Sequence, residues 1–147
     1  MFKFSLEPVL SLREKIEDNK KRELGEATQY REKVYEEKLQ LEQIKEDALN
    51  LTRKQSRESV NVLELRTLNQ YNSYMVKAVQ NKEYELNKAK QVVDEKREAL
   101  LEAVKDRKIL DNLKAIHKES FEEEEKRVEQ RILDDMVTYR FGNKGKG

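Results

Sequence analysis

Residues 75–121 read MVKAVQNKEYELNKAKQVVDEKREALLEAVKDRKILDNLKAIHKESF, a stretch of 47 residues without glycine or proline. Apolar side chains recur in it at alternating spacings of three and four, which places them on one face of an α-helix. The pattern repeats every seven residues, as in a left-handed coiled coil. Nine of its fourteen positions are apolar, and most others are lysine or arginine, whose stems can cover an apolar seam. The positions are Met75, Val79, Lys82, Leu86, Ala89, Val93, Lys96, Leu100, Ala103, Arg107, Leu110, Lys114, His117 and Phe121.

A second repeat of the same kind lies upstream, in residues 27–51, where seven of eight positions are apolar. These positions are Ala27, Tyr30, Val34, Glu37, Leu41, Ile44, Ala48 and Leu51. The same frame extends toward the N-terminus with more polar residues, so we expect a weaker seam there. The upstream positions are Leu6, Val9, Arg13, Ile16, Lys20 and Glu23.

The repeat is lost over residues 50–62, where Asn, Ser and Thr gather. These side chains compete with helical backbone hydrogen bonds, so we place a chain reversal between Lys54 and Asn61. The prediction is an all-α fold, a long two-helix antiparallel coiled-coil hairpin with a short helix near the turn. A parallel dimer of one continuous helix is the alternative, and the lost repeat favours the hairpin.

We expect residues 1–141 to form a single coiled-coil rod. Ser5 can cap the first helix, and Pro8 then falls in the first turn, where its missing amide hydrogen is harmless. The expected boundaries are about 5–54 for helix one, about 55–71 for the turn and short helix, about 72–140 for the long helix, and 142–147 for a disordered tail.

The composition excludes several classes of protein. Charged residues make up 41% of the chain and apolar residues 36%, too few to fill a globular core. The 31 basic and 30 acidic residues give no overall attraction to nucleic acid or to an anionic membrane. There is no cysteine for a disulfide, no apolar run long enough to span a bilayer, and no signal-peptide pattern. We therefore expect a cytoplasmic protein with a mechanical or adhesive role.

No pattern in the sequence indicates a catalytic or metal site. His117, the only histidine, falls on the repeat and has no second His or Cys to complete a metal site. A pH switch is one interpretation of His117, but a structural seam position is favoured. Carboxylate pairs such as Asp134 and Asp135 would lie on a solvated helix, without the cleft that raises a catalytic pKa. We expect no enzymatic activity, no cofactor and no metal.

Three segments of the chain carry a family resemblance. They are FKFSLEPVL at 2–10, followed by Leu12 and Arg13; YNSYM at 71–75, followed by Lys77, Ala78 and Val79; and EEKRVEQRILDD at 124–135, continuing to Arg140. Together they resemble the FliJ family of flagellar type III export stalk proteins, over nearly the whole chain.

The resemblance implies a soluble component of the bacterial flagellar protein export apparatus, which serves flagellum biogenesis, motility and chemotaxis. Such proteins form an antiparallel coiled coil similar to the stalk of F-type ATPases. Their joined ends sit in the export ATPase hexamer, and another part reaches the membrane export gate protein, at the cytoplasmic face of the inner membrane. They also bind export chaperones, and we expect a monomer in isolation. The alternatives are a generic coiled-coil scaffold, or the equivalent stalk of an injectisome or a rotary ATPase.

The resemblance and the charge pattern predict two contact surfaces. The ATPase contact, expected to be electrostatic and sensitive to salt, consists of Phe2, Phe4, Leu6, Lys126, Arg127 and Arg131. The export-gate contact is a helical stripe near the turn that consists of Tyr71, Met75, Ala78 and Lys82. The alternative for this stripe is a structural role, in which it packs under the short helix through Val62, Leu65 and Leu68.

Overall fold

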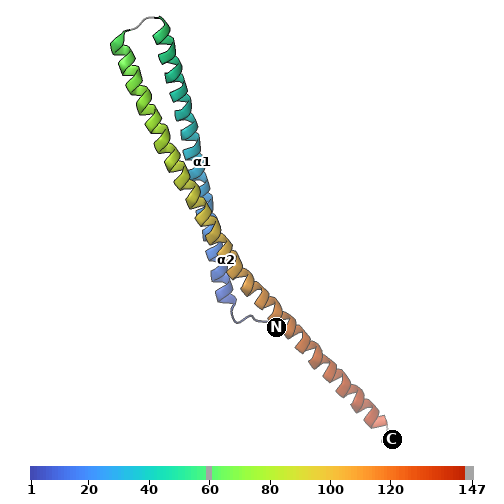
Figure 1. The fold of residues 1–147 in the computed structure, drawn as a ribbon. Helices are drawn as coiled ribbons and strands as arrows, with labels where there is room; N and C mark the ends of the chain where they lie inside the picture. The colour runs from blue at the N-terminus through green and yellow to red at the C-terminus, as the bar shows by residue number, and fades with distance from the viewer. Residues whose placement is uncertain (59–60, 145–147) are drawn as a thin grey trace. The chain divides into compact units, whose positions relative to one another are not determined.

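The structure, a computed structural model, describes residues 1–58 and 61–144, with side chains as far as Gly142. It consists of two long helices, α1 (Glu7–Glu58) and α2 (Val62–Lys144), and the described residues contain no strand (Figure 1). The prediction of an all-α fold with two long helices is therefore confirmed.

The first helix begins two residues after the predicted cap, Ser5. The amide of Glu7 donates to the carbonyl of Phe4 at 3.1 Å, and the amide of Leu10 donates to the carbonyl of Leu6 at 2.9 Å. Pro8 lies in the first turn, where its lack of an amide hydrogen breaks no helical bond. Glu7 places a negative charge at the positive end of the helix dipole. The start of α1 is thus set by a turn at residues 5 and 6 rather than by the Ser5 hydroxyl.

The second helix begins at Val62, and its cap is Asn61. The amide of Leu63 donates to Asn61 Oδ1 at 3.1 Å, and the amide of Leu65 donates to the Asn61 carbonyl at 3.0 Å. The expected boundary between a short helix and a long one near residue 71 is not found, because α2 is continuous there. The reversal expected between Lys54 and Asn61 falls partly on residues 59 and 60, which lie outside the described residues.

Polar residues near the start of α2 do not break it, because their side chains find partners compatible with helix. Thr67 Oγ1 donates to the carbonyl of Leu63 at 3.0 Å, one helical turn back. Asn72 Nδ2 donates to Thr52 Oγ1 on α1 at 2.9 Å. At the other end, α2 passes Arg140 and Gly142 and ends at Lys144, since no proline stops it and one interior glycine costs only about 1 kcal/mol. The tail predicted at 142–147 is therefore helical as far as 144, and residues 145–147 lie outside the described part.

The chain groups into two compact units, and each is described by itself. The terminal unit comprises Met1–Glu17 and Glu102–Gly147, and the middle unit comprises Asp18–Leu101. In each unit, the partners on α2 lie earlier in the chain as those on α1 lie later, apart from the neighbouring residues Asp106 and Arg107, whose order is reversed. This overall antiparallel order is consistent with the predicted hairpin. The printed partners are Glu7 with Lys114, Arg13 with Asp106 and Glu17 with Arg107 in the terminal unit, and Glu23 with Lys96, Glu37 with Lys82 and Thr52 with Asn72 in the middle unit.

Burial along α2 follows the predicted heptad. Every predicted position from Met75 to Lys114 is buried or half-buried, and the pattern also includes Leu65, Leu68 and Asn72. Val93 has 1% of its surface exposed, while Leu86 and Ala89 each have 3%. The seam on this helix was therefore predicted correctly from Met75 to Lys114, including its lysines and arginine, whereas the predicted seam position His117 is exposed.

On α1 one of the two predicted rows is wrong by one residue. The row of Ala27, Val34, Leu41 and Ala48 is buried or half-buried as predicted. The other buried row consists of Leu10, Glu17, Leu24, Arg31, Lys38, Lys45 and Thr52. The more apolar row that was predicted in its place lies at the edge of the seam. Its members Ile16, Glu23 and Glu37 are half-buried, whereas Tyr30 and Leu51 are each 48% exposed. Aliphatic stems of basic residues cover the seam, since their charged heads can stay in water.

This burial pattern predicts different costs for two identical substitutions in α2. Leu86→Ala removes a side chain that is 3% exposed and leaves a cavity, so it should lower the free energy of unfolding by about 2–4 kcal/mol. Leu101→Ala, at a residue that is 55% exposed, should change it by less than about 0.5 kcal/mol. Urea unfolding followed by circular dichroism measures both free energies. Equal effects of the two substitutions would contradict the assignment of Leu86 to the buried face of α2.

Candidate functional site

The described residues offer contact surfaces rather than an enclosed site. They contain no group of three or more His, Cys, Asp or Glu side chains suited to a metal ion. No helix among them is both long and apolar enough to cross a membrane. The hollows that the surface does contain are shallow grooves along one or both helices.

The N-terminal segment is held against α2 by aromatic contacts within the terminal unit. Phe4 is 7% exposed and meets His117 edge-on, with ring centroids 5.7 Å apart and planes at 70°. The rings of Phe2 and Phe121 are also 5.7 Å apart, at 51°. Leu6 is 36% exposed. Of the three predicted N-terminal contact residues, Phe4 therefore serves packing inside the chain, and His117 is its partner.

The predicted cationic contact residues are exposed on α2. Lys126, Arg127 and Arg131 lie in a segment where every side chain from 122 to 142 is exposed. Arg127 Nη1 is 3.7 Å from a carboxylate oxygen of Glu124, a weak contact between two solvated groups. Lys126 lies five residues beyond Phe121, about 7.5 Å further along the helix. The structure thus brings the N-terminal aromatic residues close to the start of the cationic segment.

The predicted gate stripe is divided between the seam and the surface. Tyr71 is 45% exposed, whereas Met75 is 3% exposed and packs in the seam. Ala78 and Lys82 are half-buried. A partner can therefore reach Tyr71 directly, but Met75 becomes accessible only if the helices separate.

Lys82 belongs to a network that links the two helices. Its ammonium pairs with Glu37 of α1 and lies 3.2 Å from Glu85 Oε2, and the Tyr30 hydroxyl donates to Glu85 Oε1 at 2.8 Å. The hydrogen bond to Glu37 raises the pKa of Lys82, and the bond to Glu85 raises the pKa of Tyr30. The hydrogen bond from Tyr30, with that from Lys82, lowers the pKa of Glu85. Lys82 is therefore already engaged within the chain.

The Tyr30–Glu85 bond places two surface rows beside each other in the middle unit. On α1, residues seven apart continue from Tyr30 through Glu37 and Ile44 to Leu51, and Ile44 is 44% exposed. On α2, the row through Glu85 contains Tyr71, Ala78 and Val92, the last of which is 41% exposed. We call the apolar members of the two rows, which are exposed except for the half-buried Ala78, the lateral face: Tyr30, Ile44, Leu51, Tyr71, Ala78 and Val92. Sequence reasoning missed its α1 half, because Tyr30, Ile44 and Leu51 were assigned to the seam.

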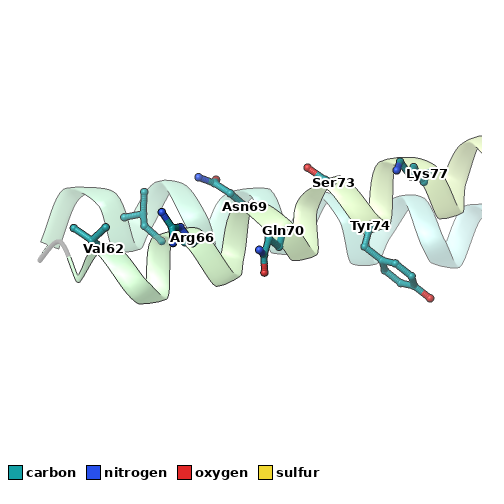
Figure 2. Close-up of a pocket in the computed structure, with 8 residues that line it drawn as sticks. Val62, Arg66, Asn69, Gln70, Ser73, Tyr74 and Lys77 are labelled. Atoms are coloured by element: carbon teal, nitrogen blue, oxygen red, sulfur yellow. The ribbon is translucent and has the colours of Figure 1, made fainter.

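A shallow groove lies near the start of α2, and all its lining side chains come from that helix (Figure 2). The residues are Val62, Leu65, Arg66, Asn69, Gln70, Ser73, Tyr74 and Lys77. Nearby, Asn72 occupies a seam position, and its buried Oδ1 accepts no hydrogen bond from the described residues. An unsatisfied polar atom weakens packing, so this end of the seam is less tightly held than the apolar part around Val93.

The four cations on the α2 seam each pair with a glutamate of α1. Lys82 pairs with Glu37, Lys96 with Glu23 at 3.4 Å, Arg107 with Glu17, and Lys114 with Glu7 at 2.9 Å. Glu17 is 6% exposed, which makes it the buried charge of the core. These pairs fix the position of one helix along the other, because a buried carboxylate without a counter-ion is costly.

Comparison with known proteins assigns the family. The family model described as flagellar FliJ protein matches residues 2–146. The chain belongs to the flagellar FliJ protein family. FliJ membership implies a component of the flagellar export apparatus and confirms the resemblance seen in the sequence. Neither a curated protein nor a solved structure matches the chain significantly.

The inter-helix network of this FliJ family member predicts a pH range of maximal stability. Bonding to Lys96 lowers the pKa of Glu23, and the network around Lys82 lowers that of Glu85. A glutamate whose pKa is lowered by folding stabilises the folded chain at any pH above the usual glutamate pKa. This stabilisation is lost as the pH falls through the lowered pKa. The raised pKa values of Lys82 and Tyr30 have the opposite effect, because their contribution is lost as pH rises through them.

We expect a stability plateau between about pH 5 and pH 9, with losses on either side. Glu23→Gln should lower stability on the plateau and flatten the acid limb in urea unfolding measured across pH. The matched control is Glu98→Gln, at an exposed position. If the loss of stability at acid pH is the same in Glu23→Gln as in the parent, the Glu23–Lys96 pair does not stabilise the chain in solution.

Proposed function

We propose that the chain is a non-enzymatic stalk of the flagellar export apparatus, inserting into the export ATPase hexamer and linking it to the membrane export gate. The observation that carries this proposal is the family match over residues 2–146. The stalk would work at the cytoplasmic face of the inner membrane, as a monomer until it is assembled. Export chaperones are further partners that the family suggests.

The mechanical element of the proposal is an antiparallel coiled-coil hairpin. Support comes from the antiparallel order of the helix contacts and from burial that recurs every three or four residues on both helices. A two-helix rod with a charged surface can occupy a ring without a tight apolar interface, which permits repeated small shifts within the ring. The cross-helix ion pairs would resist sliding of one helix along the other under load.

We place the ATPase contact at the joined ends of the chain, on Phe2, Leu6, Lys126, Arg127 and Arg131. Support comes from the aromatic contact between Phe2 and Phe121, which holds the N-terminus beside the cationic segment of α2. The three cations are exposed, and Arg127 makes only a weak contact with Glu124, so all three can meet acidic groups of a ring. Phe4 contributes by positioning this segment, since its own ring is buried.

Reversal of the three cations tests this contact. Lys126→Glu, Arg127→Glu and Arg131→Glu together should weaken stimulation of the ATPase at least about tenfold, because charge attraction is replaced by repulsion. Helicity should remain, since all three side chains are exposed. Stimulation assays at several salt concentrations measure the effect, which should be largest at low salt.

The matched control reverses three exposed cations elsewhere, Lys54, Lys90 and Lys105. It changes the net charge equally and should leave stimulation within about twofold of the parent. If both triple variants lose stimulation equally, the attraction depends on total charge and the placement is wrong.

We place the gate contact on the lateral face, with Tyr71 as the anchor that both the sequence and the surface favour. Tyr71 and Ile44 are 45% and 44% exposed, and aromatic and aliphatic side chains on one face can fill a partner's pocket. Met75 supports this face from the seam, and Lys82 holds the two helices together beneath it through Glu37 and Glu85.

Substitutions on and under the lateral face should separate binding from stability. Tyr71→Ala with Ile44→Ala should weaken capture by the purified gate protein about tenfold or more, with little change in Tm. Met75→Ala should lower Tm by several degrees, because it opens a cavity in the seam. The control is Tyr84→Ala, which removes a tyrosine that is 63% exposed elsewhere on α2. Full gate binding by the Tyr71/Ile44 variant would exclude this face.

A further inference from the structure

The last part of α2 carries an apolar stripe that no other element covers. Val128, Ile132, Met136 and Tyr139 are 44%, 54%, 61% and 71% exposed. At about 100° per residue they fall within about 80° of arc on one side of the helix. In Figure 1 this segment, at the red end of the colour range, extends as a single helix within the terminal unit.

The period of the stripe differs from that of the seam. Phe121 and Ile132 are eleven residues apart, as are Val128 and Tyr139. Continuing the heptad instead would place Glu124, Val128, Arg131 and Asp135 on the seam, so of the stripe only Val128 would lie on it. An eleven-residue repeat has about 3.67 residues per turn and winds to the right around a helix, whereas a heptad winds to the left. The stripe is therefore not a continuation of the α1–α2 seam but a face suited to another element.

Carboxylates border this stripe. Glu124, Glu125 and Glu129 lie within about 80° of Ile132 around the helix axis. Together with Phe121 and Val128 they line a shallow notch at the start of the stripe. Lys126 and Arg127 lie about 120° and about 140° from Ile132, on the other side of the helix. The segment thus has an acidic-apolar face, formed by Glu124, Glu125, Val128, Glu129, Ile132 and Met136.

We propose that the acidic-apolar face binds a basic amphipathic helix of another protein. The partner's apolar stripe would cover Val128, Ile132 and Met136, and its lysines or arginines would meet Glu124, Glu125 and Glu129. The negative border repels an anionic membrane surface and a parallel second copy, so charge selects this occupant. The proposal goes beyond the stalk function, because Lys126 and Arg127, two of the three cations assigned to the ATPase, lie on the other side of the same helix. The third, Arg131, lies about 100° from Ile132, at the edge of the face.

A synthetic pair of peptides tests the proposal on the full chain. One fluorescent helical peptide of about 20 residues carries leucine every three or four residues, flanked by lysine, and its twin replaces each lysine by glutamate. In anisotropy titrations the basic peptide should bind and the acidic twin should not. Glu124→Gln, Glu125→Gln and Glu129→Gln combined should weaken binding about tenfold, and so should Ile132→Ser alone.

The control removes three carboxylates at exposed positions elsewhere, with Glu36→Gln, Glu46→Gln and Glu83→Gln. It should keep the peptide affinity within about twofold, and the Glu124/Glu125/Glu129 variant should keep ATPase stimulation. A loss of peptide binding in the control equal to that of the test variant would show non-specific attraction and overturn the proposal. Sedimentation gives a second outcome that would overturn the proposal. If the parent is a dimer, Ile132→Ser is a monomer and neither binds the peptide, the partner on this face is a second copy of the chain.

The absence of cysteine allows the side of binding to be located. A fluorophore attached at Val128→Cys should respond to the basic peptide, whereas one at Lys126→Cys should respond much less. An equal response at both positions would mean that the peptide follows total charge rather than the acidic-apolar face, and would overturn the proposal.

Discussion

Ion pairs across the seam are the constraint on which the pairing of the two helices depends. A chain with 36% apolar residues cannot fill a continuous apolar seam, so lysine and arginine occupy part of it and glutamates on the facing helix neutralise them. Such pairs add little net stability when compared with apolar packing. Their larger effect is on register. A slip of one heptad in the middle unit would place Glu23 opposite Ala89 or Ala103, and Glu37 opposite Met75 or Ala89. Each carboxylate would then lose its counter-ion on α2.

The outcome for the two helices shows what the sequence can predict. On α2, apolar residues occupy both rows of the heptad, so counting the repeat identified the buried face correctly. On α1, the true second row contains Arg31, Lys38 and Lys45, and a row one residue away is more apolar. Sequence reasoning chose the more apolar row, because hydrophobicity alone does not count the aliphatic stems of basic residues. The Asn61 cap was missed because the polar cluster around it was interpreted as a turn.

The wrong row on α1 had a consequence for the candidate site. Placing Tyr30, Ile44 and Leu51 in the seam hid the exposed half of the lateral face, while Met75 was counted as a contact residue although it is buried. A one-residue shift rotates a helix by about 100°, which is enough to exchange core and surface. Contact residues on coiled coils are therefore less predictable than the fold itself. The fold requires only the spacing of the apolar residues, whereas a contact residue also requires knowing which residues of the repeat face the partner helix.

The packing of α2 differs between three parts of one continuous helix. Near Asn72 the seam is polar and contains an unsatisfied carbonyl oxygen, around Val93 it is apolar and tightly packed, and beyond Phe121 the heptad gives way to an eleven-residue spacing with no facing helix. Stability is therefore concentrated in the middle of the helix, away from the exposed segment beyond Phe121. This arrangement suits a stalk, since a helix that is rigid in its packed part can transmit force while its exposed ends exchange weak contacts. The same separation explains why contact variants at the ends are expected to leave folding intact, whereas seam variants are not.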